Sequence, residues 1–166
     1  HMPRRVIIDT DPGVDDALAL ILALQSPELY IDAITTVSGN VDVELATQNT
    51  LTVLGLFPPE RRPPVARGAN RPLVRVLDTA AHVHGDDGLG GVSRMLTAAG
   101  QPCYPAVGAP QLMQDAVVCI LDLIRHAPGE LTLVALGPLT NLALAWRRDA
   151  HTFHQLAEVV IMGGAV

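Results

Sequence analysis

The sequence predicts an α/β fold in which a mainly parallel sheet carries helices on both faces. Short apolar, β-branched runs alternate with longer stretches of helical periodicity, which is typical of repeated βαβ units. The strand-like runs are continuously apolar rather than alternating, as expected for strands covered on both sides. The composition, 49% hydrophobic and 17% charged over 166 residues, is that of a single globular domain.

The first two βα units are predicted within residues 5–57. RVIID (5–9) is a short β-branched run, and DDALALILAL (15–24) then places apolar residues at helical spacing. IDAITTV (31–37) again has strand composition, and VDVELATQNTLTVLGLF (41–57) returns to the helical period. Strands and helices therefore follow one another in the order that a parallel sheet requires.

The middle of the chain carries one short strand and a long irregular segment. PVARG (64–68) is the predicted strand. Between about residues 71 and 110 the pattern dissolves into Gly, Pro, His and Asp. Because irregular segments of this length are uncommon in compact domains, we expect a functional loop or lid here.

The last third returns to the alternation, with a helix at AVVCILDLI (116–124), a strand at LTLVAL (131–136), a helix at PLTNLALAWRRD (138–149) and a strand at VVIMGG (159–164). No helical stretch follows VVIMGG to cover that strand. We therefore expect residues 3–166 to be a single α/β domain that is the N-terminal half of a larger one. Residues 1–2 are interpreted as a tag remnant and the initiator methionine.

Charge and composition argue against several classes of protein. A formal net charge of −6 gives no support to a nucleic-acid-binding surface. No apolar run reaches the roughly 18 residues of a membrane span, and no secretory segment precedes the first strand. Cys103 and Cys119 have no metal or redox spacing, so we expect free thiols. We expect a cytoplasmic protein with no nucleic acid or membrane partner.

The turn DTDPGVDD concentrates four carboxylates: Asp9, Asp11, Asp15 and Asp16. Carboxylates this close repel one another and raise some of their pKa values unless a cation lies among them. All the available ligands are hard oxygens, which favours calcium or magnesium over zinc or copper. Helix capping explains one of these carboxylates, or two, but not four. The end of a strand that runs into a helix is also where open α/β sheets bind ligands.

Two other interpretations of this turn stay open at this point. An apolar strand that ends in Asp-x-Asp also marks haloacid-dehalogenase-like phosphatases, although Gly13 stands where Thr or Val is usual. A third hypothesis is a non-catalytic folded fragment that self-associates through its uncovered sheet edge. An EF-hand is excluded, because Leu20 stands where the bidentate Glu is required.

Five motifs together resemble the inosine-uridine preferring nucleoside hydrolases, and they follow in order over almost the whole chain. They are DTDPGVDDALAL, AITTVSGN, HGDDGLGG, LVALGPLTNLALA and VVIMGG. The resemblance implies a nucleoside-hydrolase-like, Rossmann-like fold and a calcium-dependent enzyme. Such an enzyme cleaves the N-glycosidic bond of ribonucleosides into ribose and free base. The resemblance also implies a homo-oligomer.

The same resemblance assigns roles around the cation. Asp11 is implied to be a calcium ligand and the general base toward the metal-bound water. Asp16 is implied to be a second ligand, and Leu136 to offer its backbone carbonyl. Asp9 is implied to brace the loop as structural support.

Further residues are implied to bind the substrate. Asp15 would hold ribose hydroxyls, Asn40 would lie beside the nucleophile and the ribose, and Met162 would line the ribose pocket. His84 would lie on a loop near the base. The resemblance also implies a late His-Asp pair and a further ribose contact beyond position 166, so we expect impaired catalysis by this chain alone. From its local pattern, Asn141 is expected only to hydrogen-bond the start of its own helix.

Overall fold

The computed structural model describes residues 2–108, 112–113 and 115–164. Within this part of the chain, six strands form one sheet in the order β4-β3-β2-β1-β5-β6, and all neighbouring strands are parallel. The strands are β1 (Arg4–Thr10), β2 (Leu29–Thr36), β3 (Val65–Arg67), β4 (Leu112–Met113), β5 (Thr132–Ala135) and β6 (Glu158–Ile161). The predicted parallel sheet is confirmed, and β4 is an additional short strand.

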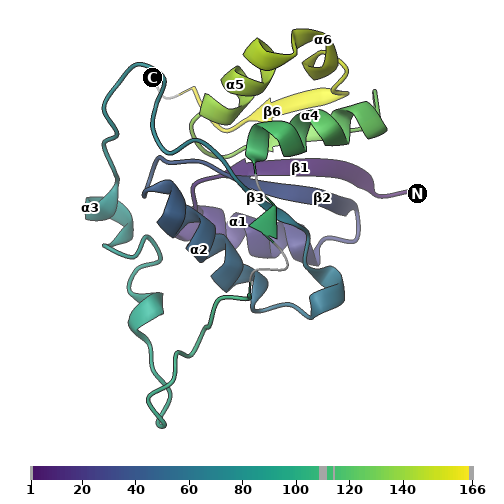
Figure 1. The fold of residues 1–166 in the computed structure, drawn as a ribbon. Helices are drawn as coiled ribbons and strands as arrows, with labels where there is room; N and C mark the ends of the chain where they lie inside the picture. Colours follow the sequence, from purple (N-terminus) through teal and green to yellow (C-terminus); the bar gives the residue numbers. More distant parts are fainter. Residues whose placement is uncertain (1, 109–111, 114, 165–166) are drawn as a thin grey trace.

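Helices cover both faces of the sheet, as predicted (Figure 1). On one face lie α1 (Val14–Gln25) and α2 (Val43–Leu54). On the other face lie α4 (Ala116–His126), α5 (Thr140–Arg148) and α6 (Ala150–Phe153). The short elements α3 (Ala81–His84), η1 (Pro59–Arg61) and η2 (Val92–Arg94) belong to the connecting segments.

The core has two main clusters because successive strand side chains point to opposite faces of the sheet. Val6 and Ile8 of β1 pack in the cluster that includes Leu20 of α1. Ile7, between them, packs in the cluster that includes Ile120 of α4. The continuous apolar run in β1 is therefore explained by burial on both faces.

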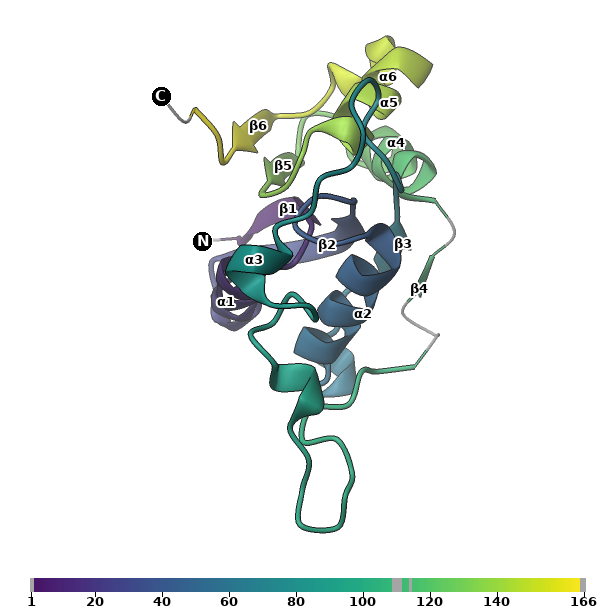
Figure 2. The same ribbon diagram turned by 90° about the vertical axis from the view of Figure 1, so that its left-hand side faces the viewer.

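Residues 68–108, the described part of the chain after β3, are irregular, as predicted, apart from α3 and η2. Figures 1 and 2 show this segment passing α3 and then making a long excursion beyond α2. An isolated antiparallel bridge joins Leu96 and Pro102 within this segment. None of the helices in the described ranges has the length and apolar character needed to cross a membrane.

β6 is the edge strand that the sequence predicted to be uncovered, and its apolar side chains are exposed. Val159 is 38% exposed, Val160 41% and Ile161 51%. β6 pairs with β5 on one side.

The strand order reverses between β1 and β5. From β1 the chain builds β2, β3 and β4 on one side and then returns to place β5 and β6 on the other. Asp9 near the end of β1 lies opposite Thr35 of β2 and Ala135 of β5. Open α/β sheets bind ligands at the carboxyl ends of strands where the order reverses, so the topology directs attention to this edge.

Candidate active site

A cavity of about 630 Å³ lies at this carboxyl edge. Its lining comes from the segments that follow β1, β2, β5 and β6, together with residues of the irregular segment around α3. Six of the residues singled out from the sequence line it: Asp11, Asp15, Asn40, His84, Leu136 and Met162. Segments far apart in the chain therefore meet at one cavity.

Asp9 is fully buried next to this cavity. Its Oδ2 accepts hydrogen bonds from the Thr35 hydroxyl at 2.5 Å and from Nδ2 of Asn141 at 2.8 Å. Burial raises the pKa of the Asp9 carboxyl to about 6, although both hydrogen bonds oppose that rise. These contacts fit the supporting role expected for Asp9.

Asp11 is a carboxylate held in a tight backbone cradle. It is 3% exposed, and its Oδ2 accepts a hydrogen bond from the Asn40 N–H at 2.6 Å. A Cβ at Gly39 or Gly137 would collide with the Asp11 carboxylate, so both positions require glycine. Burial raises the pKa of Asp11 to about 7, the Asn40 hydrogen bond opposes this, and repulsion from Asp16 adds to it.

Asn40 ties together Asp11 and Asp16. Its Nδ2 donates to Oδ2 of Asp16 at 3.2 Å and to the Asp11 carbonyl at 3.3 Å. Asp16 is 2% exposed and also accepts from the Gly13 N–H at 3.2 Å, where α1 begins. Burial raises the pKa of Asp16. Asn40 is therefore more than a turn residue, since it connects the segment after β2 to both carboxylates.

Asp15 and His84 lie together at the entrance of α1. Asp15 is exposed, and its Oδ1 lies 3.9 Å from Nδ1 of His84. The His84 side chain is only 13% exposed, and its Nδ1 accepts a hydrogen bond from the Val14 N–H at 3.3 Å. His84 is thus docked on the aspartate turn rather than solvated on a loop.

Leu136 and Met162 enter from the other side of the strand reversal. The Leu136 N–H donates to the Asp9 carbonyl at 2.8 Å, and the Met162 N–H donates to the Ala135 carbonyl at 2.9 Å. Met162 is 56% exposed, so it is not a core residue. Leu136 is the first residue after β5 and Met162 the first after β6, so the two strands place both residues at the carboxyl edge of the sheet.

The donors present fit a hard cation such as calcium. Over the described ranges, no three His, Cys, Asp or Glu side chains gather as a metal site by themselves. Asp11 and Asp16 would therefore need a backbone oxygen such as that of Leu136 to complete a ligand set. Oδ1 of Asp11 is buried and has no hydrogen-bond partner among the residues described, which leaves one carboxylate oxygen to be satisfied. A cation would also relieve the repulsion between Asp11 and Asp16.

Sequence reasoning missed the role of Asn141. The expectation that Asn141 bonds only to the start of its own helix is wrong. Its Nδ2 donates to Asp9 and to the Thr36 carbonyl at 2.9 Å, and its Oδ1 accepts from the Ala69 N–H at 2.9 Å. The side chain is fully buried and links the ends of β1 and β2 to the residues after β3. Asp78, which no motif marked, also lines the cavity.

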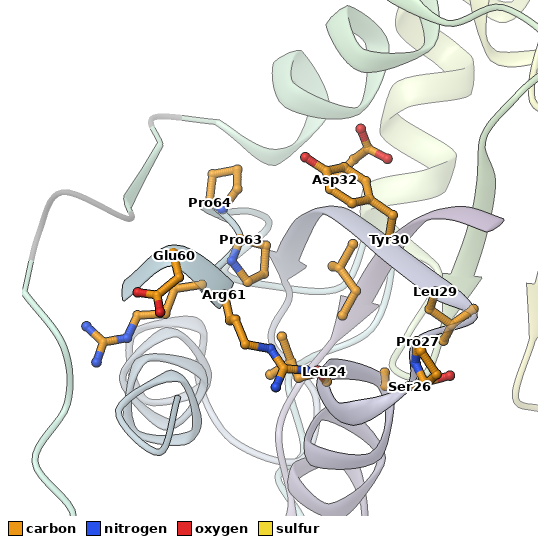
Figure 3. A pocket seen from close by; sticks show the side chains of 13 residues that line it. Leu24, Ser26, Pro27, Leu29, Tyr30, Asp32, Glu60, Arg61, Pro63 and Pro64 are labelled. Atoms are coloured by element: carbon orange, nitrogen blue, oxygen red, sulfur yellow. Dashed lines mark hydrogen bonds between the residues drawn. The ribbon is translucent and has the colours of Figure 1, made fainter. Parts of the chain in front are cut away.

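A second hollow of about 380 Å³ lies beside the C-terminus of α1 and the start of β2, away from the aspartate turn (Figure 3). Its charged groups do not converge on a common point. The Arg61 guanidinium donates to the Leu24 carbonyl at 2.6 Å, and Asp32 is paired with Arg5 at 2.5 Å. Since these groups bond to the protein itself, the hollow lacks the convergent polar groups of a ligand site.

The fold and the carboxylate-lined cavity define an α/β protein with a candidate ligand site at its strand reversal. The chain belongs to the inosine-uridine preferring nucleoside hydrolase family, whose model matches residues 6–166. It is 43% identical over 168 residues to an inosine-uridine preferring nucleoside hydrolase of Leishmania major, covering 98% of this chain and 49% of that protein. It is 41% identical over 165 residues to uridine nucleosidase 1 of Arabidopsis thaliana, covering 98% and 45%.

Solved structures of nucleoside hydrolases also match this chain. The plant nucleoside hydrolase PpNRh1 matches with a TM-score of 0.83 at 40% identity, covering 98% of this chain and 48% of that one. An inosine-guanosine nucleoside hydrolase matches with a TM-score of 0.80 at 37% identity, covering 98% and 49%. The chain thus spans about half the length of the relatives it matches. Its family membership decides against the phosphatase alternative.

Proposed function

We propose that this chain acts in the hydrolysis of the N-glycosidic bond of ribonucleosides, releasing ribose and a free base. The observation that carries the proposal is the cavity at the strand reversal, where Asp11, Asp15 and Asn40 line one space. Relatives named as nucleoside hydrolases of inosine and uridine, or of uridine, support the substrate class.

Asp11 is the proposed general base. A base works best when its pKa lies near the working pH, and burial raises the pKa of Asp11 to about 7. The Asn40 N–H holds one oxygen of the carboxylate, so the other is left to take a proton from an attacking water. Asp11 becomes protonated in this step, so the buried carboxyl is then neutral. The water oxygen forms a bond to the anomeric carbon as the N-glycosidic bond breaks, and the base leaves with that electron pair and takes a proton from solvent.

The remaining cavity residues are proposed to bind and orient the nucleoside. N-glycoside cleavage passes through an oxocarbenium-like state, and carboxylates close to the sugar stabilise its positive charge. Asp15, exposed at the rim, would accept hydrogen bonds from ribose hydroxyls. Met162 would pack against the sugar, and His84 would lie near the base.

Calcium is the proposed cofactor, held by Asp11, Asp16 and the carbonyl of Leu136. When bound, the cation would polarise water and accept neighbouring sugar hydroxyls in its large, flexible shell. Asn40 contributes by hydrogen-bonding both Asp11 and Asp16 and so holding the two carboxylates close together. Asp9 contributes by linking the ends of β1 and β2 through its hydrogen bond from Thr35.

The test is release of reducing sugar from inosine and uridine by the purified chain, with calcium and with a chelator. Release that the chelator abolishes would support both the hydrolysis and the metal. Protein that is folded by circular dichroism yet releases no sugar would contradict catalysis by this chain alone.

A second candidate is a non-catalytic folded unit that self-associates. The exposed apolar side chains of β6 favour association through this edge, as a homo-oligomer.

For either function we propose a cytoplasmic location, because Cys103 and Cys119 are both free thiols in the described chain. The formal net charge of −6 favours a small nucleoside over nucleic acid as the partner.

A further inference from the structure

Asp87, in the irregular segment, organises the loop of residues 84–93, which we call the Asp87 loop. Its Oδ1 accepts from the N–H groups of Leu89 at 3.0 Å and Gly91 at 2.9 Å. Its Oδ2 accepts from the Ser93 N–H at 3.0 Å and from the Ser93 hydroxyl at 2.6 Å. Asp87 is 9% exposed. With four donors on one carboxylate, Asp87 holds its own loop together.

Asn49 of α2 joins this loop to the aspartate turn. It is 2% exposed, and its Nδ2 donates to the Pro12 carbonyl at 3.2 Å and to the Asp87 carbonyl at 2.9 Å. The two carbonyls belong to different segments, so one amide group bridges the turn and the loop. Gly88 has a φ of 72°, and a Cβ there would lie 2.9 Å from Nδ2 of Asn49. The loop can approach Asn49 this closely only because residue 88 is a glycine and has no Cβ.

A second link runs through His84. The Gly90 N–H donates to the His84 carbonyl at 2.8 Å, so the loop holds the backbone of His84. The His84 ring lies against Gly13, where a Cβ would come within 2.8 Å of it, and accepts from the Val14 N–H. The contacts at Pro12 and Val14 therefore lie on either side of Gly13, between Asp11 and Asp16.

We propose that the Asp87 loop clamps the aspartate turn, and that Asn49 and Asp87 are positioning residues for the cation site. The inference rests on the proposed function, because it assumes that Asp11 and Asp16 bind the cation. Two buried carboxylates repel each other across the turn, so contacts on both sides of Gly13 are needed to hold them in a binding geometry. Supporting residues of this kind typically change metal affinity by 10-fold to 100-fold, as a rough range.

A merely structural role makes a different prediction. If Asn49 and Asp87 only stabilise the fold, their substitution lowers the melting temperature but leaves the calcium affinity of the folded chain unchanged. If they position the turn, the calcium affinity falls even at temperatures where the variant is fully folded.

The decisive variant is Asn49→Asp, which keeps the size of the side chain and replaces the NH2 group, the donor to both carbonyls, by an oxygen that cannot donate when ionised. Its matched control is Thr50→Val on the same helix, because Thr50 is fully buried and its hydroxyl donates only within the helix, to the Ala46 carbonyl at 2.9 Å. Calorimetric titration with calcium should give at least about tenfold weaker binding for Asn49→Asp. Thr50→Val should bind calcium as the unaltered chain does.

Asp87→Asn is the second variant, should Asn49→Asp fail to fold. Its control is the neighbouring Asp86→Asn, because Asp86 is exposed and pairs only with Arg94 at 3.3 Å. Nuclear magnetic resonance of the Val14 amide and the His84 ring provides a readout that needs no calcium. Both signals should shift in Asp87→Asn and stay in place in Asp86→Asn.

The outcomes separate this inference from the proposed function. Calcium affinity that changes less than about twofold in folded Asn49→Asp and Asp87→Asn overturns the clamp. If the unaltered chain binds no calcium, the proposed metal site fails, and the clamp is then judged by the Val14 and His84 signals alone. Signals that do not move in Asp87→Asn overturn it in that case as well.

Discussion

At the scale of single residues, Asp11 combines a charge with an environment that opposes it. The carboxyl is buried, its pKa is raised to about 7, and one of its oxygens has no hydrogen-bond partner in the described chain. Buried carboxyls with a strongly raised pKa are frequent at functional sites, which supports the role proposed for Asp11.

Asp11→Asn should separate function from stability. The amide cannot act as a base, so ribose release should fall by about 10²-fold to 10⁴-fold. Without calcium, the free energy of unfolding at pH 8 should rise, because no charge is buried. Sugar-release assays and urea unfolding measure the two effects. Asp86→Asn, an exposed substitution, should change neither, and an unaltered rate in Asp11→Asn would remove Asp11 from the mechanism.

Asn141 is the residue whose loss should be most damaging to the architecture of the site. Asn141→Leu removes the bonds to Asp9, Thr36 and Ala69 and leaves buried partners unsatisfied. We expect a loss of about 2 to 4 kcal/mol in the free energy of unfolding, measured with urea. Asn70→Ala, at an exposed position nearby, should stay within about 0.5 kcal/mol of the unaltered chain. Equal effects from the two variants would contradict the bridging role of Asn141.

At the scale of elements, the Asp87 loop is ordered by a carboxylate instead of by regular secondary structure. Burial alone would raise the pKa of Asp87, but the hydrogen bonds from Ser93, Gly91 and Leu89 outweigh it and lower the pKa to about 2. An aspartate in the unfolded chain has a pKa of about 3.9. The folded state therefore binds fewer protons than the unfolded state between about pH 4 and pH 2.

This difference predicts how the loop responds to acid. The stabilisation from Asp87 is fully present above about pH 4 and is lost as the pH falls through about 2. Urea unfolding of the unaltered chain and of Asp87→Asn should differ at pH 5, and the difference should shrink toward pH 2. Asp86→Asn should show no such convergence. A difference between the unaltered chain and Asp87→Asn that is constant with pH would mean that the Asp87 charge does not stabilise the loop.

At the scale of the whole molecule, the parallel sheet collects loops from distant parts of the chain at one edge. The same sheet exposes an apolar face at β6. Association through that edge is therefore the property of the whole molecule that is simplest to test.

Val160→Lys should weaken self-association. Val160 is 41% exposed in β6, and a lysine there would place charge on the proposed contact. Light scattering over a concentration series should give a lower average mass than for the unaltered chain. Val74→Lys, at a residue 95% exposed in the irregular segment, is the matched control and should not change the mass. A monomeric unaltered chain would refute the association.

Much of the fold could be predicted because its signals are local. The continuous apolar run around Ile7 requires burial on both faces, and helical spacing in residues 15–24 requires one buried face. β4 was missed because two residues carry too little pattern to indicate a strand. α3 was missed because a four-residue helix in a Gly-rich segment has no periodicity to detect.

The sequence indicated which residue types gather at the candidate site, but not how those residues are connected. Four aspartates within eight positions predict a hard cation from residue type and spacing alone, and the cation stays a prediction. Asn141 contacts Asp9, which lies 132 positions earlier in the chain. Asn49 contacts Pro12 and Asp87, at sequence separations of 37 and 38 positions. No local pattern encodes such pairs.

The sequence by itself determined the α/β alternation, the family and the concentration of carboxylates after the first strand, because each depends on residue type and on short spacing. Only the tertiary structure decided which carboxylate is buried, which amide holds it and which loop supports the turn. Burial and hydrogen bonding depend on the neighbours that folding brings together, and those neighbours come from other strands of the sheet.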